Sequence, residues 1–135
     1  MRGSLVGSVG AVVLGLTSVL SAHHSAAGID RTKSLTLVGT VRQFGWMNPH
    51  SWMEVDVPND KGEIETWKVE MTAPAYLVRA GWKSTTVRPG DKVSVTVRPL
   101  RSGEPGGLFV SIALPNGQVL TERAAIPPAP AADKP

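Results

Sequence analysis

Five stretches of alternating apolar and polar residues, interrupted once by a helix-like segment, constrain the fold of this chain more than any other feature. The alternation predicts strands in which every second side chain faces a core. These strands, with a short sixth segment, run over Leu35–Trp46, Ser51–Val57, Glu63–Met71, Lys92–Leu100, Leu108–Leu114 and Gln118–Thr121. A short helix over Ala75–Ala80 falls between the third and fourth strands. We therefore expect a mainly β fold, a small five-stranded OB-like barrel whose helix closes one end, with a β-sandwich carrying one helix as the alternative.

Local signals refine this expectation at two places. Gly39 lies inside the first strand and predicts a bulge or a tight bend. Thr72 precedes the helix, so its hydroxyl is predicted to accept a hydrogen bond from the first turn, and Gly81 is predicted to end the helix. The side chains expected to face inward are Leu35, Leu37, Val41, Met53, Val55, Val57, Trp67, Val69, Met71, Val93, Val95 and Val97.

Residues 1–22 have the pattern of an export signal. Arg2 provides the positive start, the apolar stretch from Leu5 to Leu20 follows, and Ser21-Ala22 supplies small residues for cleavage. The stretch is shorter than the ~20 residues that span a bilayer, so we expect cleavage and no stable membrane anchor. Cleavage after Ala22 would leave His23 first, and cleavage after Ser21 would leave Ala22 first. The predicted location is the periplasm or the exterior of the cell.

Composition limits the remaining organisation and the classes of function. A chain of 135 residues has room for one domain, predicted over residues 23–123, before an Ala/Pro-rich tail over 124–135 that we expect to be disordered. The chain contains no cysteine, which excludes disulfides, thiolate metal sites and a cysteine nucleophile. Its 14 basic and 11 acidic residues are mixed along the chain, which argues against nucleic acid as a partner. Sequence motifs of phosphate-binding loops, zinc proteases and serine hydrolases are missing from the mature chain, so we expect no enzyme activity.

Several short motifs together resemble a family of small exported bacterial proteins of unknown function. The motifs, found between residues 22 and 121, are His23-His24-Ser25, Leu37-Val38-Gly39-Thr40-Val41, Trp46-Met47-Asn48-Pro49-His50-Ser51-Trp52, Ala80-Gly81-Trp82 and Pro89-Gly90-Asp91. The two most specific are the histidine pair followed by serine and the segment from Asn48 to Trp52. Ala26 departs from the pattern, in which an aromatic residue often follows the serine. The resemblance implies an exported, single OB-like domain and supplies no activity.

All three histidines of the chain, His23, His24 and His50, lie within one short part of the sequence. Imidazole is a common ligand for copper and zinc. With Ala22 first, His24 is the third residue and could bind copper together with the amine and two backbone amides. With His23 first, its amine and ring could chelate one metal, with His50 as a third ligand. Copper binding is therefore one hypothesis, and the alternative is that the first two histidines are a mobile chain start and His50 bonds a backbone carbonyl.

The second predicted strand and the turn before it contain the other candidate functional side chains. His50, Trp52, Glu54 and Asp56 share one face of that strand, which is either a ligand-binding face or a solvated exterior. We predict Trp52 and Asn48 as ligand-binding residues of a non-catalytic module that recognises a small molecule or a protein partner. A small hydrolase that uses the carboxylates or His50 is a further alternative, although nothing in the sequence marks an acid/base pair.

Overall fold

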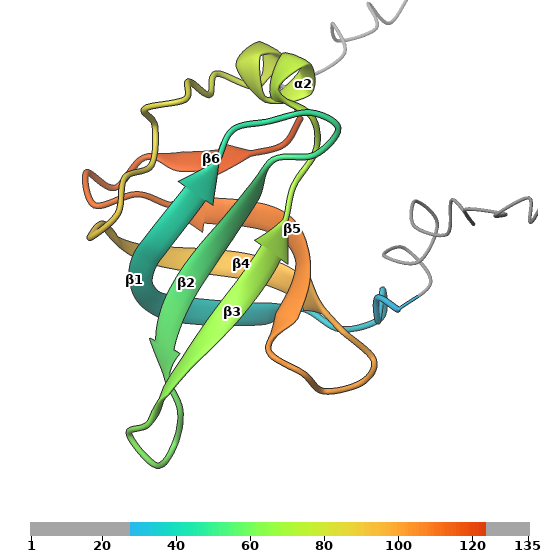
Figure 1. The fold of residues 1–135 in the computed structure, drawn as a ribbon, viewed down its shortest axis with the longest axis vertical. Helices are drawn as coiled ribbons and strands as arrows, with labels where there is room; N and C mark the ends of the chain where they lie inside the picture. The colour runs from blue at the N-terminus through green and yellow to red at the C-terminus, as the bar shows by residue number, and fades with distance from the viewer. Residues whose placement is uncertain (1–27, 124–135) are drawn as a thin grey trace, which may run out of the picture.

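The computed structural model describes residues 28–123, which form one closed β-barrel with a short helix (Figure 1). The predicted export signal over 1–22, the histidines His23 and His24, and the tail over 124–135 lie outside the described residues. The elements follow the chain as β1 (Leu35–Gly45), β2 (Trp52–Pro58), β3 (Ile64–Glu70), α2 (Pro74–Arg79), β4 (Lys92–Pro99), β5 (Gly106–Ala113) and β6 (Val119–Thr121). Within residues 28–123, no helix has the length and apolar character needed to cross a membrane.

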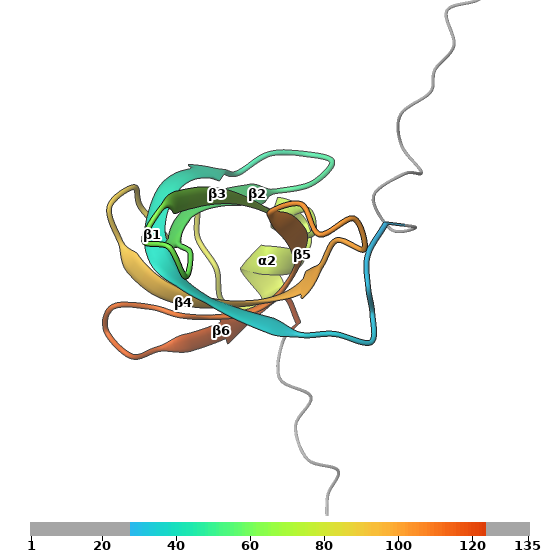
Figure 2. The ribbon, with the colours of Figure 1, turned by 90° about the horizontal axis from the view of Figure 1, so that it is seen from below.

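The order of the strands confirms the predicted OB-like barrel. The sheet runs β3-β2-β1-β4-β5-β6, and a parallel pairing of β3 with β5 closes the first five strands into a barrel, with β6 added beside β5. This closure distinguishes the fold from the alternative, a sandwich of two separate sheets. In Figure 2, which looks into the barrel from below, α2 lies across the opposite end. The predicted position of the helix, between the third and fourth strands, is therefore confirmed.

The barrel interior contains the side chains that the alternation placed there. Met53, Val55, Val95 and Val97 are fully buried, and Leu77 from α2 is equally buried against the core. Three predicted positions differ: Leu35, the first residue of β1, is 40% exposed, and Val57 and Trp67 are only partly buried against the core. Trp82 follows the helix and fills the end of the barrel, where its indole Nε1 donates to the carbonyl of Thr121 at 2.8 Å.

Gly39 marks a close approach between two backbones and not a bulge. A Cβ added there would lie 2.4 Å from the Asp56 carbonyl oxygen, so only glycine fits where β1 crosses from β4 to β2. The irregularity in the β1–β2 register lies further along, between Val41 and Gln43. The bulge predicted at Gly39 therefore lies a few residues further along β1.

Two predicted boundaries are wrong. Ala73, and not Thr72, is the N-cap of α2, and no side chain caps the helix, because alanine has no group that could accept a hydrogen bond. β5 begins at Gly106 instead of Leu108, because Gly106 and Gly107 pair with β3 and close the barrel. A Cβ on Gly107 would lie 2.4 Å from the Arg98 carbonyl oxygen. The glycines that look like a loop in the sequence are therefore required by the tight joint between strands.

Candidate ligand groove and the His50 cluster

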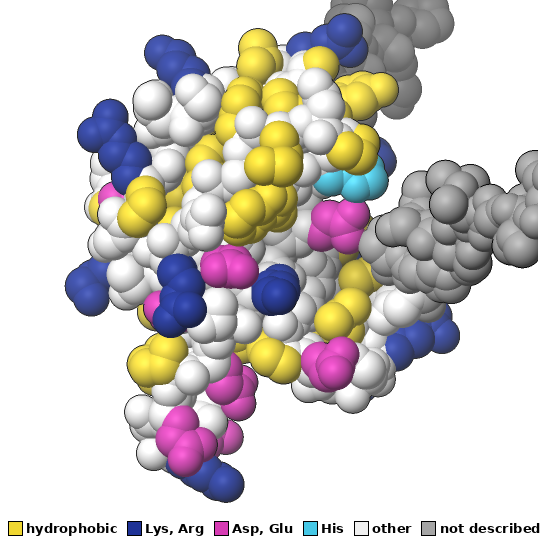
Figure 3. All heavy atoms as spheres, viewed as in Figure 1, with side chains coloured by type: hydrophobic (Ala, Val, Ile, Leu, Met, Phe, Trp, Pro, Cys, Tyr) yellow, Lys and Arg dark blue, Asp and Glu magenta, His cyan; other side chains and the backbone are white. Residues whose placement is uncertain are grey.

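A groove crosses the outer face of β2 and β3 and is bounded by the loop between β4 and β5. We call it the β2–β3 groove; it has a volume of about 640 Å³, within the range of small-molecule sites. Figure 3 shows the surface hollowed between the charged side chains over β2 and β3 and the side chains near that loop. The residues that line it are Ile29, Trp52, Met53, Glu54, Thr66, Lys68, Val69, Glu70, Leu100, Glu104, Pro105, Gly106 and Gly107.

Trp52 forms the aromatic wall of this groove. It begins β2 opposite Gly45 of β1, and its indole covers that glycine so closely that a Cβ there would lie 2.3 Å from the ring. Glycine at position 45 therefore allows the indole to lie flat against the sheet. The ring is half-buried, which leaves part of its surface open to a ligand. The prediction that Trp52 lies at a binding surface is consistent with this position and stays a prediction.

The charged side chains of the groove are mostly acidic. Glu54 and Glu70 project from β2 and β3, Glu104 lies in the β4–β5 loop, and Lys68 is the basic residue that faces them. Among the described residues, the only one of these four in an ion pair is Glu70. The groove therefore combines an apolar lining with an excess of negative charge, an arrangement that favours cationic ligands.

His50 contacts Glu70 at the end of the groove next to α2. The imidazole Nδ1 lies 3.0 Å from a Glu70 carboxylate oxygen, and the His50 side chain is 55% exposed. This contact replaces the predicted bond from His50 to a backbone carbonyl. In Figure 3 the histidine surface (cyan) lies beside an acidic side chain (magenta). At this distance the imidazole Nδ1–H can donate a hydrogen bond to the Glu70 carboxylate, which orients the ring.

Glu122 adds a second carboxylate to this end of the barrel. It accepts a hydrogen bond from the Thr72 backbone N–H at 2.8 Å, and so connects the segment after β6 to the start of the helix region. Burial raises the pKa of Glu122 above its ordinary value. The Glu70 charge acts in the same direction, while the Thr72 N–H, Arg123 and His50 oppose it. The Glu70 and Glu122 carboxylates thus both lie within electrostatic range of one imidazole.

Ser51 lies between His50 and Trp52 in the chain. Its backbone extends the pairing of β2 and β3, since its N–H donates to the Thr72 carbonyl and its carbonyl accepts from Met71. The side chain is fully buried, and among the described residues its hydroxyl oxygen has no hydrogen-bond partner. This pairing holds the backbone of Ser51, the residue after His50, against the barrel and so restricts where the His50 side chain leaves the surface.

The other predicted site residues do not converge. Asn48 is exposed in the β1–β2 loop and does not line the groove. Glu54 lines the β2–β3 groove, whereas Asp56 lines a second groove and is bonded to Thr66 and Arg42. Among residues 28–123, no group of three or more histidines, cysteines, aspartates or glutamates is arranged to hold a metal ion. The copper hypothesis therefore depends on His23 and His24.

A family model matches residues 11–110, which is most of the chain. The chain belongs to DUF6152, a family of unknown function. No curated protein and no solved structure matches it. Family membership supports the coarse resemblance seen in the sequence and assigns no ligand, reaction or partner. The function is therefore inferred from the geometry of the groove and of the His50 cluster.

Four residues of the groove and the His50 cluster were not predicted as site residues from the sequence: Lys68, Glu70, Glu104 and Glu122. For Glu70 a signal existed, because strand register places it directly opposite Trp52 on the same face. The same register pairs Lys68 with Glu54. Nothing in the local sequence indicates that Glu122 reaches the Thr72 N–H, since the two residues are brought together only by barrel closure.

Proposed function

We propose that this protein is an exported, non-catalytic binding module that holds a small organic cation with an apolar body in the β2–β3 groove. The observation that carries the proposal is the combination of the Trp52 ring with three glutamates, Glu54, Glu70 and Glu104, in one groove of about 640 Å³. The ligand's positive charge would be attracted by the carboxylates, and its apolar body would contact Trp52 and the aliphatic lining.

The position of the groove supports this proposal. In barrels of this topology, strands two and three and the two loops beside them form a ligand-binding face. Here the groove lies over β2 and β3 and is bounded by the β4–β5 loop, and His50 of the β1–β2 loop contacts the groove residue Glu70. Export is part of the proposal because of the signal pattern over residues 1–22, together with the histidine-pair and Asn48–Trp52 motifs.

Two probes of opposite charge test the proposal. Benzyltrimethylammonium and benzenesulfonate both carry a phenyl ring, and isothermal titration would measure the binding of each to the processed protein. We expect the cation to bind at least ten times more tightly than the anion. Glu104→Lys changes an exposed loop residue and should remove most of that preference. Equal affinities, or a preference that survives Glu104→Lys together with Glu54→Gln, would refute the proposal.

A further inference from the structure

The helix α2 exposes apolar side chains at one end of the barrel. Leu77 is fully buried against the core, whereas its neighbours Tyr76 and Val78 are each 58% exposed. In Figure 3 hydrophobic side chains gather over the end of the molecule where Figure 1 places α2. This end of the barrel therefore keeps apolar surface in contact with water.

The charged side chains around α2 are basic. Residues 72–90 include Arg79, Lys83 and Arg88 and no acidic residue. Arg79 is the last residue of α2, and its guanidinium lies 5.8 Å from the centre of the Tyr76 ring. This contact places positive charge and apolar atoms on one surface. We call the exposed residues of this surface the α2 face: Tyr76, Val78, Arg79, Lys83 and Arg88.

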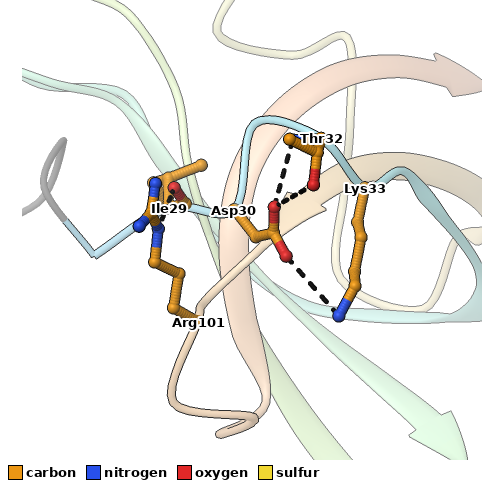
Figure 4. Close-up of polar contacts among 5 residues, drawn as sticks. All are labelled: Ile29, Asp30, Thr32, Lys33 and Arg101. Carbon is orange, nitrogen blue, oxygen red and sulfur yellow. Dashed lines mark hydrogen bonds and ion pairs between the residues drawn. The ribbon is translucent and has the colours of Figure 1, made fainter.

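The basic side chains of the α2 face differ from those at the start of the described chain. Figure 4 shows Lys33 paired with Asp30. It also shows Arg101 against Ile29, whose carbonyl accepts a hydrogen bond from the Arg101 Nε at 3.1 Å. Among the described residues, the three basic residues of the α2 face are in no ion pair. Their charge is therefore open to a partner outside the protein.

The acidic side chains that bond to residues 72–90 leave this charge in place. Within the described part of the chain they are Glu122, which accepts from the Thr72 N–H at 2.8 Å, and Asp91, which accepts from the Arg88 N–H at 2.9 Å. Both contacts are at the ends of the segment, and both use a backbone N–H. The basic side chains themselves take part in neither.

The shape of the α2 face favours a flat partner. None of residues 72–90 lines the β2–β3 groove or the second groove of the barrel surface, and in Figure 2 α2 lies across the end of the barrel. A small molecule needs a concave site. A bilayer surface instead accepts tyrosine and long basic side chains together, because their apolar parts contact the acyl region while their charges reach the headgroups. Negatively charged headgroups complement the charge of this face.

We propose that the α2 face docks on the surface of a membrane that contains anionic phospholipids. Tyr76 and Val78 enter the interfacial layer, and the three basic side chains contact the headgroups. Each basic residue near such a surface strengthens binding about fivefold. Binding of this kind is reversible and weakens as salt screens the charges. Docking does not use the β2–β3 groove, so it is independent of the proposed ligand site.

Vesicle flotation tests the proposal with the exported protein, its N-terminus determined by mass spectrometry. Vesicles of phosphatidylglycerol and phosphatidylcholine in equal parts should bind it at least tenfold more tightly than phosphatidylcholine alone, and high salt should reduce this preference. Arg79→Glu should weaken binding to the anionic vesicles at least tenfold.

The matched control for Arg79→Glu is Lys61→Glu, which changes the net charge equally. Lys61 lies in the β2–β3 hairpin, at the other end of the barrel from α2 (Figure 1), so this variant should change binding less than about twofold. Circular dichroism confirms that the variants are folded, and Lys83→Glu replaces Arg79→Glu if the latter unfolds. Equal losses in the basic-residue variants, or equal binding to the two kinds of vesicle, would overturn the proposal.

A fluorescent label tests which surface meets the membrane. The chain contains no cysteine, so one introduced cysteine can carry a label that reports its surroundings. The label should brighten on anionic vesicles at Val78→Cys and stay unchanged at Ile64→Cys, which is 61% exposed at the start of β3. A Val78 label that responds to polyglutamate and not to vesicles would overturn the proposal in favour of an acidic peptide. A response to rising protein concentration alone would overturn it in favour of a second copy of the chain.

Discussion

Two grooves of similar size lie on the outside of this barrel, and their chemistry differs. The β2–β3 groove has a volume of about 640 Å³, and a second groove, which we call the β1–β4 groove, has about 720 Å³. The first is lined by Trp52 and by carboxylates that, apart from Glu70, are in no ion pair among the described residues. The β1–β4 groove is lined by Val38, Gly39, Thr40, Asp56, Pro58, Ile64, Lys92, Val93, Ser94, Ala113 and Leu114.

The difference lies in what the charged groups already contact. Asp56 in the β1–β4 groove accepts a hydrogen bond from the Thr66 hydroxyl at 2.7 Å and pairs with Arg42 at 3.1 Å. The Asp56 carboxylate oxygens therefore already have partners within the protein. The residues that line this groove include no aromatic side chain. Volume alone therefore does not identify a site in this fold. The groove with the open carboxylates and the indole is the better candidate.

The largest expected effect concerns the strand joint that forms the floor of the β2–β3 groove. Gly107→Ala places a Cβ 2.4 Å from the Arg98 carbonyl oxygen, a clash with backbone that should cost about 2–3 kcal/mol of unfolding free energy. Gly106→Ala is the matched control, because its nearest neighbour is the flexible end of Leu100 at 2.9 Å. Urea denaturation measures both. Equal stabilities of the two variants would show that the joint is looser than described.

The next effect distinguishes the two grooves by ligand binding. Trp52→Ala should weaken benzyltrimethylammonium binding at least tenfold, since the indole supplies both apolar contact and the cation–π attraction. Val38→Ala, at a residue of the β1–β4 groove that is 67% exposed, should leave binding unchanged. Calorimetric titration of both variants checks this. Weaker binding in Val38→Ala, with unchanged binding in Trp52→Ala, would place the ligand site in the β1–β4 groove.

A smaller effect concerns the pH dependence of stability near the His50 cluster. Burial raises the folded-state pKa of Glu122 above its ordinary 4.5. The folded state therefore binds the Glu122 proton more tightly than the unfolded state, and the resulting contribution to the free energy of unfolding is fully present below pH 4.5. The contribution is lost as the pH rises through the folded-state pKa. The Glu122→Gln side chain cannot titrate, so the variant should become more stable relative to the wild type as the pH rises through the folded-state pKa of Glu122. The change should be less than about 1 kcal/mol, because solvent screens a partly exposed charge. Thermal unfolding between pH 4 and 7 measures the trend, and parallel curves for the two proteins would contradict it.

The smallest effect has the opposite sign and lies in the β1–β4 groove. The Thr66 hydroxyl, and then Arg42, lower the pKa of Asp56 below its ordinary 3.8. Its contribution to stability is therefore present above that value and is lost as the pH falls through the folded-state pKa. Asp56→Asn should be slightly less stable than the wild type at neutral pH, and the two should converge in acid. A gap that persists at low pH would assign the effect to the side chain's shape and not to its charge.

Much of the fold could be predicted because it depends on local patterns. Alternation placed Met53, Val55 and Val95 inward, and the change of period located the helix between β3 and β4. The start of β5 could not be predicted in this way. Gly106 and Gly107 look like loop residues until their pairing with β3, far away in the sequence, is known.

The candidate site was less predictable, because it depends on contacts between strands. Trp52 and His50 stand out in the sequence by residue type. Glu70 becomes a partner of His50 only through strand register, and Glu122 approaches Thr72 only because the barrel closes. A sequence pattern therefore indicates which side chains are available, and the fold decides which of them meet.

Backbone ¹⁵N chemical shifts, followed during titration with benzyltrimethylammonium, would show where on the barrel an organic cation binds. We expect the largest shifts at Trp52, Lys68, Glu70 and Gly106, with little change at Val38, Ile64 or Ser94. Shifts concentrated at the latter three residues, or none at saturating probe, would contradict the assignment of the β2–β3 groove as the binding site.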